Sequence, residues 1–355
     1  MAISTEILTS FQKIDEAYID SLLKKEIEAN NKKIVVLDDD PTGVQTVHDI
    51  SVYTNWDKDS IRQGFEEENN LFYVLTNSRG FTEDQTTKAH HEIAEVVDEV
   101  ARETGKEYIF ISRSDSTLRG HYPLETQLLK ADYEKNTGKM IDGEIMCPFF
   151  KEGGRFTIDN VHYVKYGEEL VPANETEFAK DKTFGYTAYT MPEYIEEKTK
   201  REYKAADVTC ISLEDIHNMD IDKIEAQLME VTGFNKVIVN AVDYADVKVF
   251  CTALYRAMAK GKVFMFRTAA AIVKVMGGVS NQPLLTREQM VVKETDNGGI
   301  IVVGSHTDKT TRQMEKLREN KDIAFVELNA TLVNDEAAFA EEVERCLALE
   351  EEYIS

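Results

Sequence analysis

Three consecutive aspartates follow directly on an apolar run near the start of the chain. Residues 34–37 are apolar, Asp38, Asp39 and Asp40 come next, and a Pro-Thr-Gly turn ends the segment at Gly43. Adjacent carboxylates repel and raise one another's pKa, so proteins keep them together where an arginine, a cation or a hydroxyl-bearing ligand relieves the charge. The pattern therefore predicts a binding or catalytic site. The alternative is a solvated acidic turn.

Two further apolar runs end in polar clusters of the same kind. Residues 71–75 run into a cluster that contains Arg79, and residues 108–111 run into a longer one over residues 112–120. Arginine forks onto a carboxylate, while aspartate, asparagine and serine exchange hydrogen bonds with hydroxyl groups. Helix capping would explain one such loop. Three loops from successive strands favour a site for a small polyhydroxylated or anionic ligand.

Alternating strand and helix signals predict the elements that position these clusters. Beta-type runs occupy residues 34–38, 50–54, 71–75, 108–111, 208–213, 236–240 and 263–268. Amphipathic helices are expected over the first thirty residues and near 57–68, 82–103, 123–138, 192–199, 214–231 and 244–259. This order predicts an α/β fold with a largely parallel sheet, in which strand ends meet along one edge. Residues 141–190 have weak periodicity, and the loop at 147–155 contains Arg155, which we expect to clamp an anion.

Composition narrows the class of protein. The 355 residues carry a formal net charge of −24, which argues against a nucleic-acid partner because phosphate neutralisation needs basic surface. The four cysteines have no metal-type spacing and indicate buried thiols in a reducing compartment. We see neither a signal pattern nor an apolar run long enough for a membrane span. These features predict a soluble, cytoplasmic protein with no membrane partner.

The second part of the chain has its own organisation. Residues 282–297 show no periodic pattern of apolar residues, which is typical of a linker. The linker separates an expected domain at 1–285 from a second at 298–355. A strand is expected at 299–303, followed by a turn with Ser305 and Thr307 that opens a helix. Such a helix start offers backbone N–H groups to a phosphate, although the spacing is not that of a Walker A loop.

The motifs occur in the order found in the four-carbon acid sugar kinase family, which the chain resembles over nearly its whole length. The resemblance rests on D-D-P-T-G at 39–43, N-S-R at 77–79 and above all D-S-T-L-R-G at 115–120. Further support comes from G-G-R at 153–155, V-H-Y at 161–163, I-E-E-K-T at 195–199, G-S-H-T at 304–307 and K-T-T at 309–311.

The resemblance implies ATP-dependent phosphorylation of a threonate-, erythronate- or oxo-tetronate-type acid, and a homodimer is consistent with it. It implies that the acid contacts Asp39, Arg79, Arg113, Ser114, Asp115 and Ser116. It also implies that Ser305 contacts ATP at the start of a nucleotide-binding domain. We expect Asp40 to take the proton of the terminal hydroxyl, with Asp115 as the other candidate base. Mg²⁺ and basic side chains would offset the charge of the transferring phosphoryl group.

The chain departs from the family at two places. Arg113 stands where family members commonly have lysine. A planar guanidinium with several N–H donors therefore replaces the compact ammonium group of lysine. The family also has a later glycine-rich loop, whereas the last glycine here is Gly304. We therefore expect the ATP-binding half to be started but incomplete.

Two alternative functions stay open. One is a shortened form that binds the acid without phosphorylating it. The other is a haloacid-dehalogenase-like phosphohydrolase, in which Asp38 is the nucleophile, Asp40 the acid/base, and Mg²⁺ lies between them. The phosphohydrolase also needs a later lysine and an acidic pair, and Asp243 and Asp246 have the wrong spacing for that pair.

Overall fold

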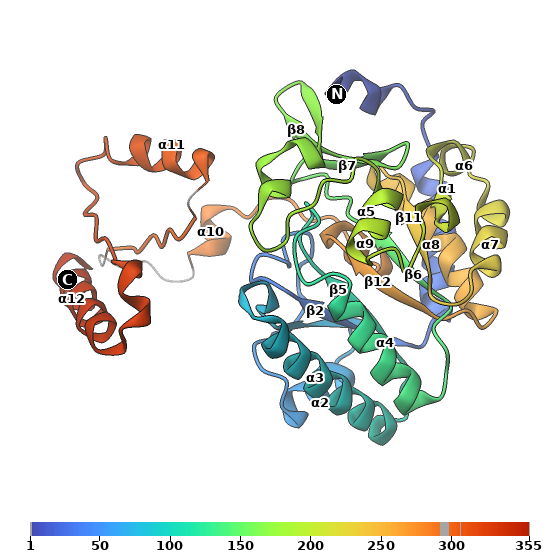
Figure 1. The fold of residues 1–355 in the computed structure, drawn as a ribbon, viewed down its shortest axis with the longest axis horizontal. Helices are drawn as coiled ribbons and strands as arrows, with labels where there is room; N and C mark the ends of the chain where they lie inside the picture. Colours follow the sequence, from blue (N-terminus) through green and yellow to red (C-terminus); the bar gives the residue numbers. More distant parts are fainter. Residues whose placement is uncertain (1, 292–297, 306, 355) are drawn as a thin grey trace. The chain divides into compact units, whose positions relative to one another are not determined.

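A computed structural model describes residues 2–291, 298–305 and 307–354 of the chain (Figure 1). The chain divides into two compact units between Gln282 and Pro283, and each is described by itself. In the described residues, no helix has the length and apolar character needed to cross a membrane.

The first unit is built on an eight-stranded sheet with the strand order β10-β11-β6-β12-β5-β2-β4-β3. The strands are β2 (Lys33–Asp38), β3 (Val52–Tyr53), β4 (Leu71–Leu75), β5 (Tyr108–Arg113), β6 (Gly143–Cys147), β10 (Thr209–Ile211), β11 (Asn235–Val239) and β12 (Phe264–Thr268). Every neighbouring pair runs parallel. The predicted α/β fold with a largely parallel sheet is confirmed.

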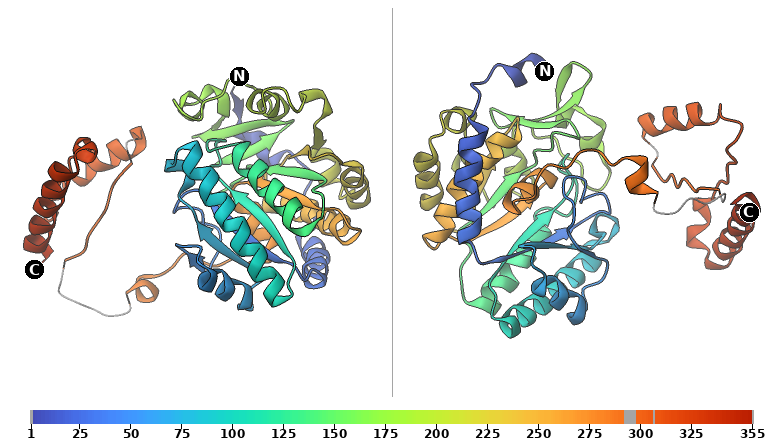
Figure 2. Two further views of the ribbon diagram at one scale, coloured as in Figure 1. Left: turned by 60° about the horizontal axis from the view of Figure 1, so that its bottom comes forward. Right: turned by 180° about the vertical axis from the view of Figure 1, so that it is seen from behind.

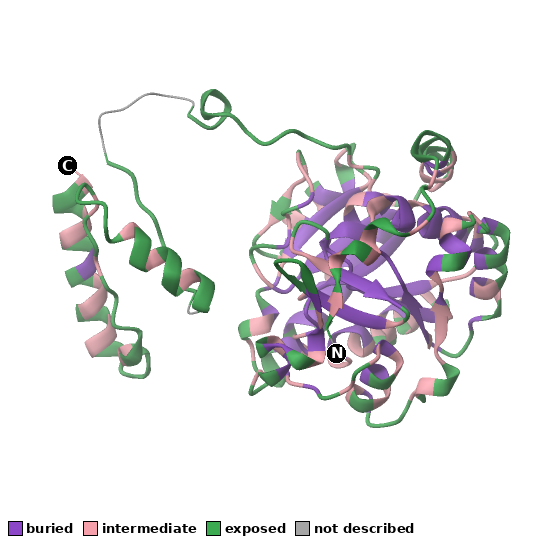
Figure 3. Cartoon of the chain, turned by 90° about the horizontal axis from the view of Figure 1, so that it is seen from above, coloured by how far each residue is buried: buried purple, intermediate pink, exposed green. Residues whose placement is uncertain are grey.

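Helices cover both faces of this sheet (Figure 2). They are α1 (Glu16–Ala29), α2 (Lys58–Glu66), α3 (Glu83–Thr104), α4 (Leu124–Thr137), α5 (Met191–Lys198), α6 (Leu213–His217), α7 (Ile221–Glu230), α8 (Tyr244–Ala259) and α9 (Ala270–Met276). Val35 and Leu37 pack with α2, α3 and α4, whereas Ile34 and Val36 pack with α1, α7, α8 and α9. Side chains alternate along a strand, so an unbroken apolar run serves two cores at once. Figure 3 shows this buried sheet enclosed by helices with exposed outer faces.

A second, antiparallel sheet has the order β1-β9-β8-β7. Its strands are β1 (Ile3–Ser4), β7 (Arg155–Ile158), β8 (Val161–Tyr166) and β9 (Glu169–Pro172). An isolated bridge joins Thr157 to Ala241, just beyond the carboxyl end of β11. The small sheet therefore lies next to the strand ends of the parallel sheet, as β7 and β8 do in Figure 1. The sequence signal was weak here because these strands are short and partly exposed.

Two helix predictions need adjustment, and one helix was missed. The N-terminal helix begins only at Glu16, where Asp15 accepts a hydrogen bond from the Tyr18 N–H as N-cap. The helix expected over 214–231 is two helices, α6 and α7, because Met219 between them adopts a positive φ of 56° that no α-helix accommodates. Helix α9 was not predicted from its apolar sequence, which periodicity cannot distinguish from a buried strand.

The second unit contains α10 (Arg287–Met290), α11 (Asp308–Leu317), the 3₁₀ turn η6 (Ala330–Asn334) and α12 (Glu336–Ile354). The strand expected at 299–303 is wrong, since these residues pair with no other strand within the described part of the chain. A strand exists only when a neighbour accepts and donates its backbone hydrogen bonds. Val302 accordingly leaves 86% of its surface exposed. The predicted linker falls partly on residues 292–297, which lie outside the described residues, as does His306.

Candidate active site

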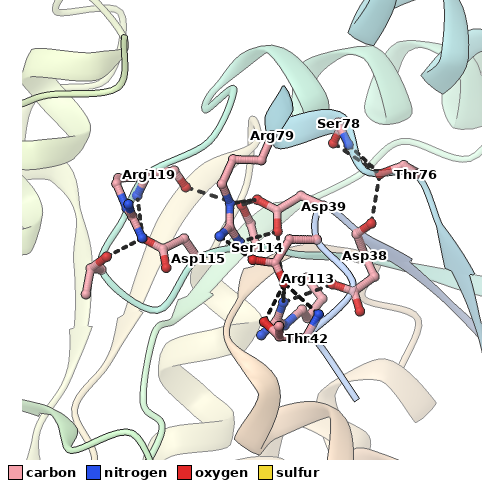
Figure 4. Close-up of polar contacts among 12 residues, drawn as sticks. Asp38, Asp39, Thr42, Thr76, Ser78, Arg79, Arg113, Ser114, Asp115 and Arg119 are labelled. Atoms are coloured by element: carbon pink, nitrogen blue, oxygen red, sulfur yellow. Dashed lines mark hydrogen bonds and ion pairs between the residues drawn. The ribbon is translucent and has the colours of Figure 1, made fainter. Parts of the chain in front are cut away.

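The three predicted polar clusters meet at one edge of the parallel sheet, because β4 and β5 both pair with β2. The chain leaves β2 toward β3 on one side, and it leaves β5 toward β6 on the other. Such a change of direction marks the crevice where open α/β sheets bind ligands. Figure 4 shows the aspartates and arginines of these strand ends turned toward one another. We call this group of side chains the strand-end site.

Asp38 is the innermost carboxylate of the strand-end site. It is 1% exposed, and its Oδ1 accepts a hydrogen bond from Arg113 Nη1 at 2.9 Å. Burial raises the Asp38 pKa to about 7, against the opposing charge of Arg113. A Cβ at Gly43 would lie 1.7 Å from Asp38 Oδ2, so the turn must carry glycine. A carboxylate enclosed in this way is badly placed to attack phosphorus, which argues against the phosphohydrolase alternative.

Arg79 is shared by the next two aspartates. Its Nε and Nη2 donate to Asp39 Oδ2 and Oδ1 at 3.2 and 2.6 Å, and its Nη1 contacts Asp40 Oδ2. The Ser114 hydroxyl also donates to Asp39. Burial raises the pKa of Asp39, although the charge and hydrogen bonds of Arg79 oppose the shift. All three guanidinium nitrogens of Arg79 are therefore engaged by carboxylates before any ligand arrives.

Asp40 faces outward more than its neighbours. Its side chain is 19% exposed, and its Oδ1 accepts hydrogen bonds from the Thr42 N–H, at 2.7 Å, and from the Thr42 hydroxyl. Burial acts to raise the Asp40 pKa, but the charge of Arg79 and the bonds from Thr42 outweigh it and lower the pKa. Asp40 is therefore ionised at neutral pH and accessible.

Asp115 has one occupied and one open carboxylate oxygen. Oδ2 accepts hydrogen bonds from Arg119 Nε at 2.8 Å, from the Arg119 N–H at 3.4 Å, and from the Thr117 hydroxyl. Within the described part of the chain, Oδ1 has no hydrogen-bond partner. Burial would raise the Asp115 pKa, yet the hydrogen bond from Arg119 and the charges of Arg79 and Arg119 hold it well below its usual range. Asp115 thus offers an ionised oxygen to a ligand hydroxyl.

Arg155, the first residue of β7, contacts the same aromatic ring as Arg119 of the strand-end site and differs from the arginines of that site. Its Nη1 donates to the Gly153 carbonyl, and its guanidinium lies 5.3 Å from the ring centre of Phe178. Among the described residues it forms no ion pair with a carboxylate, and its buried Nε has no hydrogen-bond partner. Arg119 lies 5.1 Å from the centre of the same ring. Both guanidinium groups contact the Phe178 ring, and Arg155 keeps unused donors for an anion.

Arg267, at the end of β12, was missed by the sequence analysis. It is 4% exposed, and its Nη2 donates to the Arg119 carbonyl at 2.7 Å. At Gly120, where φ is 117°, a Cβ would lie 2.6 Å from Ser114 Oγ and 3.2 Å from Arg267 Nη2. The available signal was an Arg-Thr pair that ends an apolar strand, like the clusters after β4 and β5. Phe178 carried no signal, because it lies in the region of weak periodicity.

The remaining predicted residues are placed as follows. Arg113 and Ser114 point into the site and bind Asp38 and Asp39, while Ser116 turns its carbonyl toward His162 Nε2, at 2.7 Å. Ser305 and Thr307 lie in the second unit, where their hydroxyl oxygens are 3.4 Å apart and Thr307 caps α11.

Mg²⁺ finds no prepared site among these residues. In the described residues, no group of three or more histidine, cysteine, aspartate or glutamate side chains is arranged to hold a metal ion. Each of the four site aspartates already pairs with an arginine: Asp38, Asp39 and Asp115 accept a hydrogen bond from one, and Asp40 forms an ion pair with Arg79. The hydroxyls at the start of α11 suit a phosphate group instead.

The family model of the sugar-binding N-terminal domain matches residues 34–276. The chain belongs to this family. The match covers the parallel sheet from Ile34 onward and every residue of the strand-end site. The family resemblance inferred from the motifs is thereby confirmed at the level of the sugar-binding domain. No match was found among curated protein sequences.

Three solved structures are similar to this chain at low sequence identity. A Bordetella bronchiseptica protein with a domain of unknown function, DUF1537, was solved as a domain-swapped dimer with bound citrate. It is 18% identical, with 88% of this chain and 70% of that chain covered and a TM-score of 0.48. A Haemophilus influenzae protein of the DUF1537 family is 16% identical. The similarity covers 80% of this chain and 65% of that chain, with a TM-score of 0.46. A putative tRNA synthase from Salmonella typhimurium LT2 is 12% identical. The similarity covers 70% of this chain and 55% of that chain, with a TM-score of 0.48. The chain thus spans between 55% and 70% of the length of these proteins.

Proposed function

We propose that this chain binds a four-carbon sugar acid at the strand-end site and that the acid is phosphorylated with ATP. One observation carries the proposal. Arg155 has no carboxylate partner within the described residues, and Asp115, whose charge acts on Arg155, has an open oxygen. The site therefore offers a cation for a carboxylate together with an acceptor for a hydroxyl, which are the two functional groups of a sugar acid.

The arginines divide into two roles in this proposal. Arg79 and Arg113 neutralise the three consecutive aspartates and keep them in place. Arg155, with Arg119 beside it, receives the carboxylate of the acid, because its spare N–H groups and its aromatic support suit a planar anion. The role of Arg79 is accordingly to hold Asp39 and Asp40, and its contact with the acid is secondary.

Asp40 is proposed as the base for the reacting hydroxyl, with Asp115 orienting a second hydroxyl. Asp40 Oδ2 contacts one donor, Arg79, and a carboxylate oxygen has two lone pairs, so Oδ2 can accept a hydroxyl proton. Its lowered pKa keeps it ionised but makes it a weak base. Catalysis would therefore depend mainly on positioning the hydroxyl for in-line transfer.

ATP and Mg²⁺ complete the proposal. Ser305 and Thr307, at the start of α11, would contact ATP phosphates through hydroxyl and backbone N–H groups. Mg²⁺ bound to those phosphates would neutralise the charge that develops during transfer. A homodimer, which is consistent with the family resemblance, is included in the proposal.

Thermal melting of the chain with threonate, erythronate and their oxidised relatives, with and without Mg-ATP, tests the function. We expect one acid to raise the melting temperature, and ATP to be consumed only when that acid is present. Arg155→Met should abolish the shift caused by the acid. Arg256→Met is the matched control, because Arg256 is also partly buried but pairs with Glu26 away from the site.

Three other outcomes would decide against parts of the proposal. An acid-dependent shift without ATP consumption would support a binding protein and refute the kinase. The absence of a shift with every acid would refute sugar-acid binding. Release of phosphate from phosphate esters without ATP would support the alternative function as a phosphohydrolase.

A further inference from the structure

The loop that carries Asp115 and Arg119 is held from outside along its whole length. Four consecutive backbone carbonyls, those of residues 116–119, each accept a hydrogen bond from a side chain of another element. The pairs are His162 Nε2 to Ser116 at 2.7 Å, Tyr186 Oη to Thr117 at 3.1 Å, Tyr194 Oη to Leu118 at 2.8 Å, and Arg267 Nη2 to Arg119 at 2.7 Å. We call these four donors the carbonyl clamp.

The donors of the carbonyl clamp come from both sheets and from the segment between them. His162 is on β8, Arg267 on β12, Tyr194 on α5, and Tyr186 in the loop that precedes α5. All four are buried. The bonds to Ser116, Thr117 and Leu118 are buried, and a lost donor there would leave a carbonyl unsatisfied. The Arg119 carbonyl also accepts from the Ser114 hydroxyl, at 3.3 Å. The antiparallel sheet and the parallel sheet are both joined to the loop in this way.

The loop needs such support, because its backbone conformation is unusual. Leu118 has a φ of 72°, which L-amino acids rarely adopt, and Gly120 has a φ of 117°. A residue in this conformation persists where its surroundings determine it. The carbonyl clamp stabilises this backbone conformation, because it fixes the direction of the carbonyl on each residue from Ser116 to Arg119.

We propose that the carbonyl clamp positions Asp115 and Arg119 for the sugar acid and so sets the affinity of the site. Asp115 Oδ2 is held by three donors that all belong to Thr117 and Arg119 (Figure 4 shows the Arg119 contact). A loop that shifts would move these donors and rotate the open Oδ1 away from the ligand. The clamp residues are positioning residues, because none of them contacts the acid in the proposed function, on which this inference rests.

His162 acts in one protonation state. Its Nε2 donates to a carbonyl and must carry the proton, so Nδ1 accepts a hydrogen bond from the Thr157 hydroxyl at 2.9 Å. Burial lowers the pKa of His162 to about 4, against the hydrogen bond to Ser116. The ring therefore stays neutral near neutral pH, and the clamp holds at the pH values at which binding would be measured.

Tyr194→Phe tests the clamp with the smallest change in packing. The substitution removes one hydroxyl and keeps the ring, which stacks on Tyr122 at 5.7 Å and meets Tyr186 edge-on at 5.0 Å. Tyr255→Phe is the matched control, because Tyr255 is also buried and donates its hydroxyl to a backbone carbonyl, that of Met276, at 2.8 Å. Met276 ends α9, so this bond lies away from the strand ends.

We expect both variants to lose stability to a similar extent. Tyr194→Phe alone should weaken sugar-acid binding roughly three- to tenfold, as for the loss of one buried hydrogen bond. Tyr186→Phe should act in the same direction. Equal affinity of the wild type and Tyr194→Phe for the acid would overturn the inference.

Hydrogen exchange of the ligand-free protein supplies a second readout. Backbone amides of residues 116–120 should exchange faster in Tyr194→Phe than in either the wild type or Tyr255→Phe. If the amides of this loop exchange at the same rate in Tyr194→Phe and in the wild type, the proposed role of the carbonyl clamp is refuted, even if no acid binds. Failure of the wild-type protein to bind any acid, together with faster loop exchange in Tyr194→Phe, would instead refute the proposed function and leave the clamp of the loop supported.

Discussion

Asp38→Asn should stabilise the protein increasingly as the pH rises from acid to weakly alkaline values. Burial raises the pKa of Asp38 from its ordinary value of 3.8 to about 7 in the folded protein. The folded state therefore holds the proton more tightly than the unfolded state. The corresponding stability is present below the unfolded pKa and is lost as the pH rises through the folded pKa. Asparagine has the same shape and still offers an oxygen to Arg113, but its side chain does not titrate.

The size of the effect follows from the two pKa values. Each pKa unit corresponds to about 1.4 kcal/mol, so the wild type should lose about 4 kcal/mol relative to Asp38→Asn between about pH 4 and pH 8. Urea unfolding of both proteins across this range measures the difference, in which titrating groups that do not interact with Asp38 cancel. A difference that stays constant would refute the reasoning. A difference that shrinks with rising pH would mean that the charge of Arg113 outweighs burial and lowers the Asp38 pKa below its ordinary value of 3.8.

Three further predictions concern the same strand ends. Gly120→Ala places a Cβ 2.6 Å from Ser114 Oγ, and it should cost more than about 2 kcal/mol in urea unfolding and weaken acid binding. Gly105→Ala, also at positive φ but with nothing within 4 Å, is the control and should cost about 1 kcal/mol without affecting binding. Arg79→Met leaves a buried aspartate without its cation and should cost about 3–5 kcal/mol in urea unfolding, so a loss near zero would contradict the described pairing. Asp40→Asn should lower kcat by roughly a hundredfold or more with little change in acid affinity, and a near wild-type kcat would exclude Asp40 as the base.

The location of the site could be predicted because it depends on local pattern and on one rule of topology. Apolar runs that end in Asp38, Arg79 and Arg113 identify buried strands with polar carboxyl ends. Parallel strands place these ends along one edge, and the sheet order makes the three strands neighbours. The role of each side chain could not be read in the same way. The engagement of Arg79 by Asp39 and Asp40 depends on how two loops approach in three dimensions.

Residues that support the site from a distance left little trace in the sequence. His162, Tyr186 and Tyr194 donate to carbonyls between 46 and 76 residues away along the chain. A hydrogen bond to a backbone carbonyl imposes no pattern on the residue that accepts it, so the sequence shows no matching pair. The failed strand at 299–303 has a related cause, because a β-prone segment forms a strand only when a partner is present.

The sequence by itself determined the α/β class, most strands and helices of the parallel sheet, and the edge at which the polar clusters meet, while β6, in the region of weak periodicity, and α9 were missed. These follow from periodicity and from the carboxyl ends of buried strands, which are properties of neighbouring residues. Tertiary structure alone decided which arginine keeps unused donors, which carboxylate oxygen stays open, and which distant side chains hold the loop of Asp115. Those outcomes depend on contacts between segments far apart in the chain, where burial and competing hydrogen bonds determine the partner of each group.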